Sequence, residues 1–257
     1  MLGRFTLAFG GLCLLKAVDL AVRLPAHLPA AQARAFIALW IVAALGVAVG
    51  VWRRAGLCAL VALAVAICVL TSWRMYNHHL VLIVMIALIL ALFPRDEQVT
   101  LLKAQLSIVY AFAAAAKVNA AYLSGAVLDD TLASGDMGRI VRFDGLEPAL
   151  LQALAIASVA VEAGLAVALW FETTRRPAAV AGIVFHVVMV VFVSYGGLSV
   201  VRLVVFSGLM LALYLPFFDA HATSRAQAGV SGSSTVTSSP RYRVTTRSSS
   251  AMRAESR

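Results

Sequence analysis

Charged residues are too scarce in this chain for a water-soluble protein. Only 13% of its 257 residues are Asp, Glu, Lys or Arg, and 62% are apolar, whereas soluble domains are about 25% charged. A soluble domain of this length has too little interior to bury that much apolar surface. The same composition excludes disorder over most of the chain. The sequence therefore predicts a protein that uses the lipid bilayer as its solvent.

Cysteine is also rare, and its three occurrences form no recognisable pattern. Cys13, Cys58 and Cys68 each lie inside an apolar run. Without paired or closely spaced cysteines, the chain has no disulfide framework and no Cys-x-x-Cys ligand motif. No metal site is therefore expected.

Long uncharged stretches dominate what the sequence does contain. A helix needs about 20 mainly apolar residues to cross a bilayer, and the stretches predict an all-α, polytopic transmembrane helix bundle of about eight helices. The candidate spans are Gly3–Leu24, Ala35–Trp52, Ala55–Ser72, Leu80–Phe93, Val99–Asn119, Ala149–Phe171, Pro177–Gly197 and Leu198–Phe218. Lys16 and Asp19 interrupt the first span where a cleaved signal peptide needs an unbroken apolar core, so a retained helix is expected.

Basic residues separate the apolar stretches, which is typical of a membrane orientation signal and not of a nucleic-acid surface. If Arg53 and Arg54 face the cytoplasm, seven basic residues of the short loops lie inside and five lie outside. An even number of spans then places both termini in the cytoplasm. The sequence thus predicts a multi-pass protein of the cell membrane whose partner is the lipid bilayer and which binds no nucleic acid.

Two stretches are too polar to span the membrane. Residues 120–148 carry several Asp, Glu and Gly residues and are predicted to form an outer loop that folds over the bundle. Residues 220–257 are predicted to form a disordered, Ser/Thr/Arg-rich cytoplasmic tail, because residues 221–257 hold 10 serines and 5 threonines and almost no large apolar side chains. Residues 1–219 are the predicted transmembrane domain.

Ionisable residues inside the spans are the candidates for chemistry, because each of them costs free energy in lipid. Lys117 follows four alanines at the end of the fifth span, and Tyr110 lies seven residues earlier on about the same helix face. A partly desolvated amine beside such small residues can act as a base, although a lysine near a helix end can also extend to the interface. His78 begins the fourth span on the same outer side, so an outer pocket with Lys117 and His78 as catalytic residues is predicted.

The neighbours of His78 are the remaining candidates for ligand contacts. Asn77 and His79 flank it in the sequence and are predicted, together with Tyr110, to bind the ligand. An interfacial belt of polar and aromatic residues is the alternative interpretation of the same segment.

Other intramembrane polar residues are predicted to be structural. Glu162 and His186 lie near the middle of spans six and seven, where pairing would lower the cost of burying each of them. Lys16 and Asp19 are three residues apart, on one helix face, and are expected to pair as well. Arg202 is expected either to hold an acidic partner or to extend to the interface.

Four short motifs resemble a known family in their order and spacing. They are Tyr76-Asn77-His78-His79-Leu80, the stretch from Gln105 to Asn119 with Leu123-Ser124-Gly125, Val161-Glu162-Ala163-Gly164-Leu165, and Phe185-His186. Together they resemble the transmembrane module of vitamin K-dependent gamma-carboxylases and the wider, bacterial-type HTTM family, over roughly residues 1–218. The resemblance implies an HTTM-like bundle in which Lys117 deprotonates a vitamin K hydroquinone and His78 assists it. A quinone is then the implied cofactor.

Three functions are left as alternatives. The first is an integral membrane protein that binds a lipoquinone or another lipid-like small molecule at the Lys117–His78 pocket. The second is a non-catalytic membrane partner in the maturation or export of another protein, with the outer loop 120–148 as the contact surface. The third is a transporter, for which Glu162 and His186 would supply polar groups at mid-membrane. The sequence leaves open whether the chain is an enzyme.

Overall fold

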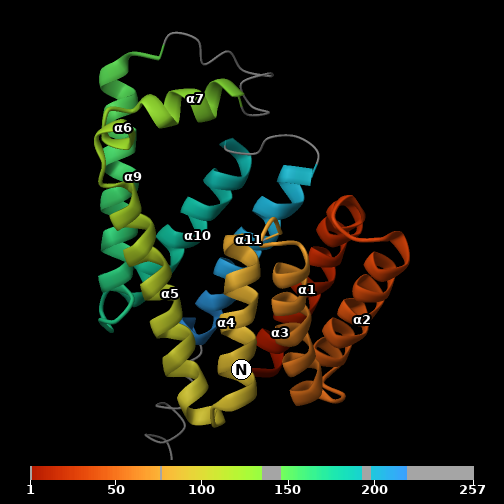
Figure 1. The fold of residues 1–257 in the computed structure, drawn as a ribbon. Coiled ribbons are helices and arrows are strands. Elements are labelled where there is room, and N and C mark those ends of the chain that lie inside the picture. The colour runs from red at the N-terminus through yellow and green to blue at the C-terminus, as the bar shows by residue number, and fades with distance from the viewer. Residues whose placement is uncertain (1, 76, 135–145, 193–197, 219–257) are drawn as a thin grey trace, which may run out of the picture. The chain divides into compact units, whose positions relative to one another are not determined.

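The computed structural model describes residues 2–75, 77–134, 146–192 and 198–218, and every regular element in these ranges is a helix (Figure 1). The predicted all-α fold is confirmed. Each predicted span corresponds to one long helix: α1 (Leu2–Arg23), α2 (Ala30–Val49), α3 (Arg53–Leu70), α4 (His78–Leu92), α5 (Arg95–Lys117), α9 (Pro148–Ala168), α10 (Arg175–Phe192) and α11 (Leu198–Phe218). Three short helices connect them, namely the 3-10 helix η1 (Leu24–Ala26), α6 (Ala120–Leu123) and α7 (Ala126–Ser134).

Length and composition mark most of these long helices as membrane-spanning. Within the described ranges, six are long and apolar enough to cross a bilayer: α1 with η1, α2, α3, α5, α9 and α11. Helix α4 is apolar but shorter, at 15 residues. Large apolar side chains such as Leu7 and Val42 are 59% and 60% exposed, a surface that soluble monomers avoid. The chain is therefore an integral, multi-pass membrane protein.

Helix α11 is central to the bundle, because it contacts α1, α4, α5 and α10. It runs antiparallel to α1: a Cβ at Gly208 would meet the side chain of Leu12, and Arg202 lies beside Asp19 further along. The start of α1 and the end of α11 consequently lie at the same end of the bundle. Half of the apolar window of each helix is buried, a larger share than in the other four candidate spans.

Small residues let the first three helices approach closely. A Cβ at Gly10 would lie 2.7 Å from the backbone of Ala48, and one at Gly56 would lie 2.8 Å from the carbonyl oxygen of Ala43. Such backbone proximity increases dispersion contacts, which drive helix association in lipid. Gly10 therefore fixes the packing of α1 on α2, and Gly56 that of α3 on α2.

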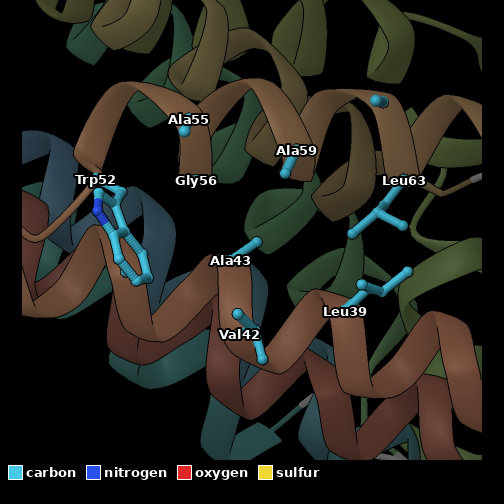
Figure 2. Close-up of a pocket in the computed structure, with 10 residues that line it drawn as sticks. Leu39, Val42, Ala43, Trp52, Ala55, Gly56, Ala59 and Leu63 are labelled. Atoms are coloured by element: carbon cyan, nitrogen blue, oxygen red, sulfur yellow. The ribbon is translucent and has the colours of Figure 1, made fainter.

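A shallow apolar groove of about 410 Å³ runs between α2 and α3 (Figure 2). Leu39 and Val42 line it from α2, Leu63 lines it from α3, and the indole of Trp52 lies at one end. None of the lining residues is ionisable. The groove therefore provides no groups for chemistry, and its surface is suited to contact with acyl chains.

Part of the predicted outer loop 120–148 is helical, since α6 and α7 lie within it and both contact α9. Gly125 makes the turn between them, with φ at 85°. A Cβ at this position would also come within 2.8 Å of the backbone at Leu151 in α9. The turn therefore requires glycine both for its left-handed backbone and for its close approach to α9. Residues 135–145 of the loop and the predicted tail 220–257 lie outside the described residues.

Candidate functional site

An ion pair joins the end of α5 to α9. The ammonium nitrogen Nζ of Lys117 donates a hydrogen bond to Oε1 of Glu162 at 2.7 Å. Glu162 is only 4% exposed, and its second oxygen, Oε2, is buried with no hydrogen-bond partner among the described residues. The Lys117 side chain is 21% exposed. The pair thus offers one unpaired acceptor beside an amine that a ligand can still reach.

Two aromatic rings flank the ammonium group of Lys117. Its Nζ lies 5.3 Å from the centroid of the Tyr122 ring and 5.8 Å from that of Phe185. Both distances fall within the range of about 6 Å for a cation–π contact. Because Tyr122 belongs to α6 and Phe185 to α10, four helices contribute to the surroundings of this one amine. The rings add flat apolar surface next to a charged, hydrogen-bonding pair.

The turn after Lys117 is organised by Asn119. Its side-chain amide donates to the carbonyl of Ala116 at 3.0 Å, and its side-chain oxygen accepts from the backbone N–H of Tyr122 at 2.9 Å. The second contact is a helix N-cap, so the same residue follows the end of α5 and starts α6. The hydroxyl groups of Tyr122 and Ser158, on α9, are 2.8 Å apart and hydrogen-bonded. Asn119 therefore positions the Tyr122 ring next to the amine.

A second buried group continues from this site toward α11. The Tyr110 hydroxyl is hydrogen-bonded to Nε2 of His186 at 2.8 Å and also to the hydroxyl of Tyr214. Tyr110 and Tyr214 are each 1% exposed and His186 is 3% exposed. The adjacent positions of Phe185 and His186 on α10 connect this group to the aromatic surroundings of Lys117. A Cβ at Gly182 would overlap the Tyr214 hydroxyl, so α10 and α11 pack tightly here.

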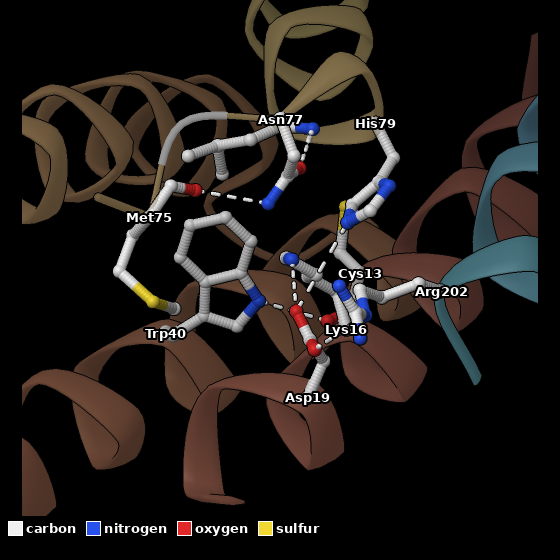
Figure 3. A network of polar contacts seen from close by, with 9 residues as sticks. Cys13, Lys16, Asp19, Trp40, Met75, Asn77, His79 and Arg202 are labelled. Atoms are coloured by element: carbon white, nitrogen blue, oxygen red, sulfur yellow. Dashed lines mark hydrogen bonds and ion pairs between the residues drawn. The ribbon is translucent and has the colours of Figure 1, made fainter. Parts of the chain in front are cut away.

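A separate charged cluster, the Asp19 cluster, is formed by Lys16, Asp19, His79 and Arg202 (Figure 3). Lys16 pairs with Oδ2 of Asp19, and both residues are completely buried. The Arg202 Nε lies 3.6 Å from Oδ1, and the His79 Nε2 lies 4.0 Å from Oδ2. One carboxylate therefore serves two basic side chains, a lysine from α1 and an arginine from α11.

Neighbouring hydrogen bonds hold the helices around the Asp19 cluster. The indole of Trp40 on α2 donates to the carbonyl of Cys13 on α1 at 2.8 Å. Asn77 is the N-cap of α4, where its side chain accepts from the backbone N–H of Leu80 at 2.9 Å. Asn77, which lies two residues before His79, thus fixes where α4 begins, and the His79 side chain faces the Asp19 cluster.

The structure does not bring Lys117 and His78 together. His78 is exposed at the start of α4, whereas the neighbouring His79 is 7% exposed and faces Asp19. The expectation of one pocket assumed that consecutive antiparallel helices stay adjacent along their length. Instead, α4 and α5 diverge from the turn that joins them, and the end of α5 lies against α9 (Figure 1).

The expected pairing of Glu162 with His186 is also not observed. Glu162 is bound to Lys117, and His186 is bound to Tyr110. An ammonium group offsets the burial of a carboxylate better than a neutral imidazole does. The predicted ligand residues are likewise separated, since Asn77 caps α4, His79 belongs to the Asp19 cluster and Tyr110 lies in the buried group with His186.

Sequence reasoning did not single out Tyr122, Ser158 or Tyr214. Their roles depend on partners that are distant along the chain; Tyr110 and Tyr214, for example, are 104 positions apart. One usable signal was present: a tyrosine within an apolar span needs a partner for its hydroxyl when it is buried. Among the described residues, no group of three or more His, Cys, Asp or Glu side chains is arranged to hold a metal ion.

Residues 97–221 match the family model described as the HTTM domain. No curated protein and no solved structure matches this chain. The matched range includes Lys117, Glu162 and His186, and it begins after the part of the chain that supplies Lys16, Asp19 and His79 to the Asp19 cluster.

Proposed function

Since the chain is an HTTM-domain protein of the membrane, we propose that it binds the ring of a reduced lipoquinone, a quinol, at Lys117 and Glu162. The proposal is carried by Oε2 of Glu162, which is buried and lacks a hydrogen-bond donor among the described residues. An unsatisfied buried polar group costs about 1–3 kcal/mol. The hydroxyl of a quinol supplies the missing donor.

The neighbouring groups support a flat, weakly polar ligand. The rings of Tyr122 and Phe185 flank the Lys117 amine and provide surfaces on which a quinol ring can stack. The Lys117 amine can donate to a quinol oxygen as well as to Glu162, because an ammonium group carries three protons. An oxidised quinone has only carbonyl acceptors, which Lys117 can satisfy but Glu162 cannot. The site is therefore proposed to favour the reduced form.

The same pair can accept a proton from its ligand. A quinol hydroxyl bound to Oε2 of Glu162 can transfer its proton to this carboxylate, which leaves a quinolate anion and a neutral carboxylic acid. Lys117 remains charged and stabilises the anionic oxygen. The residues thus provide acid–base chemistry for a quinol, and redox chemistry would additionally need an electron acceptor.

Replacing Glu162 by glutamine tests this proposal. The amide keeps an oxygen for Lys117 but places an NH₂ donor where Oε2 accepts, so we expect binding of a short-chain 1,4-naphthoquinol to weaken about tenfold, equivalent to about 1.4 kcal/mol. Binding of the corresponding quinone should stay the same or improve. Anaerobic titration of the purified protein measures both. The matched control is Glu147→Gln, which changes an exposed carboxylate at the start of α9. Equal quinol binding by wild type and Glu162→Gln would refute the proposal.

We also propose that the start of α1 and the end of α11 face the cytoplasm. The start of α1 and the end of α11 lie at one end of the bundle, and Arg53 and Arg95 line a hollow there together with Leu2 and Gly3. Arginines concentrate on the cytoplasmic side of membrane proteins. Their arrangement at this end therefore supports the orientation expected from the loop charges.

Cysteine labelling measures this orientation. In a Cys58→Ser background, a membrane-impermeant maleimide should label Arg74→Cys on intact cells, because that residue is exposed before α4 at the opposite end. Arg176→Cys, exposed near the start of α10, should be labelled only after the membrane is opened. The reverse pattern would invert the proposed topology.

A further inference from the structure

Three arginines surround a hollow at the starts of α3 and α5. Arg53 and Arg54 begin α3, Arg95 begins α5, and together with Gln98 they line a cavity of about 330 Å³, here called the arginine pocket. A second hollow of about 450 Å³ shares Arg53 and Arg95 and extends to the first residues of α1. None of these residues belongs to the proposed quinol site or to the Asp19 cluster.

Hydrogen bonds hold the arginine pocket open and orient its side chains. Gln98 is 3% exposed, and its amide nitrogen donates to the carbonyls of Leu90 and Phe93 at 3.1 and 2.7 Å. This leaves its oxygen to accept from Nη2 of Arg53 at 3.2 Å. The Nε of Arg54 donates to the carbonyl of Ala91 at 3.2 Å. A buried amide thus fixes one guanidinium, and a backbone carbonyl fixes another.

The pocket has an excess of positive charge. No ion pair joins Arg53, Arg54 or Arg95 to a carboxylate among the ion pairs of the described residues. Asp96 and Glu97, in the first turn of α5, are exposed. Neither α3 nor α5 has a side-chain cap at its start, and α3 has no acidic residue in its first turn. Unsatisfied N–H groups and a partial positive charge at the helix starts therefore add to three guanidinium groups.

Aromatic and apolar neighbours place this charge at the level of the membrane interface. Trp52, directly before Arg53, is 76% exposed, and Phe93 at the end of α4 is 39% exposed. Tryptophan is enriched where acyl chains meet head groups. The pocket therefore combines phosphate-binding groups with a surface that contacts acyl chains.

We propose that the arginine pocket binds the phosphate of an anionic phospholipid. Guanidinium groups bind phosphate oxygens in pairs of parallel hydrogen bonds, and basic pockets between transmembrane helices are suited to acidic head groups. Bound there, the lipid phosphate bridges the starts of α3 and α5, while the acyl chains extend past Trp52 and Phe93. Free inorganic phosphate has the same anionic chemistry and lacks those chains.

Lipid retention by the purified full-length chain tests the proposal. Native mass spectrometry with phosphatidylglycerol should detect a bound lipid on wild type, with at least tenfold weaker binding to Arg53→Gln/Arg95→Gln. The control Arg34→Gln/Arg74→Gln removes two exposed arginines at the other end of the bundle and should bind as wild type does. Arg53→Lys/Arg95→Lys keeps the charge but loses paired hydrogen bonds, so intermediate affinity is expected.

Three outcomes would overturn the proposal. Wild-type affinity for phosphatidylglycerol in both pocket variants would show that the pocket does not hold the lipid. Equal retention of zwitterionic phosphatidylcholine by wild type would show that the head-group charge is not recognised. Equal thermal stabilisation by inorganic phosphate and by phosphatidylglycerol at matched concentration would assign the pocket to a free anion. The Lys variant, which preserves the pocket's charge, keeps the test decisive if the Gln variant does not fold.

Discussion

Replacing Asp19 by asparagine is expected to lower the free energy of unfolding by about 3–5 kcal/mol, the usual cost of removing one partner from a buried ion pair. Asp19 is completely buried and is the carboxylate shared by Lys16 and Arg202. An amide has nearly the same shape, so the loss is one of charge. Lys16, also completely buried, would then remain beside Arg202 without an anion. Chemical or thermal unfolding in detergent measures the effect.

Two further variants distinguish the loss of the Asp19 charge from a nonspecific effect of replacing a carboxylate by an amide. Asp129→Asn changes an exposed carboxylate on α7 and should alter the stability by less than about 0.5 kcal/mol. Lys16→Met/Asp19→Asn removes the buried cation along with the anion, so it should be more stable than Asp19→Asn alone. If Asp19→Asn is as stable as Asp129→Asn, the Asp19 cluster does not stabilise the bundle.

Replacing Lys117 by methionine is expected to destabilise the protein by about 3 kcal/mol, more than Glu162→Gln does. The asymmetry follows from burial, since Glu162 is 4% exposed and the Lys117 side chain is 21% exposed. Without Lys117, neither oxygen of this buried carboxylate has a hydrogen-bond donor among the described residues. Without the Glu162 charge, the lysine keeps an amide oxygen to bond and can extend toward the interface, which limits the loss to about 1 kcal/mol.

A double-mutant cycle tests the coupling of this pair. The variant Lys117→Met/Glu162→Gln should be more stable than Lys117→Met, because the buried charge is gone. The matched control on the same helix is Lys103→Met, which removes a contact 5.1 Å from the Phe217 ring and should cost no more than about 1 kcal/mol. Additive effects of the two substitutions in the cycle would contradict the ion pair as the source of the loss.

The positions of the helices were predictable from the sequence because hydropathy and length are local properties. Each of the eight predicted spans corresponds to a helix of the structure, six of these helices are long and apolar enough to cross a membrane, and residues 97–221 match the HTTM domain model. Lys16 and Asp19 were predictable neighbours for the same reason, since three residues of α-helix bring two side chains to one face. The sequence did not show which glycines are needed for helix packing. The need for glycine at position 10, for example, depends on how closely the facing helix approaches it.

The candidate site was less predictable, because it depends on which helices pack together. Lys117 and Glu162 were both recognised as costly intramembrane residues, but their pairing joins positions 45 residues apart. His78 and His79 were adjacent candidates, and the cap formed by Asn77 and the packing of α4 decide that His79 is the buried one. Successive residues of a helix point about 100° apart. Sequence spacing gives this angle, but it does not say which of the two directions faces a neighbouring helix.

The sequence by itself determined that this chain is an all-helical membrane protein with charged residues that need partners. That result follows from the free energy of transferring apolar and charged side chains into lipid. This free energy depends mainly on the composition of each segment and little on the other segments. The tertiary structure alone decided the partners that lie on different helices: Glu162 for Lys117, Tyr110 for His186, and Asp19 for Arg202. Helix rotation and crossing set those contacts, and both result from the packing of all helices together.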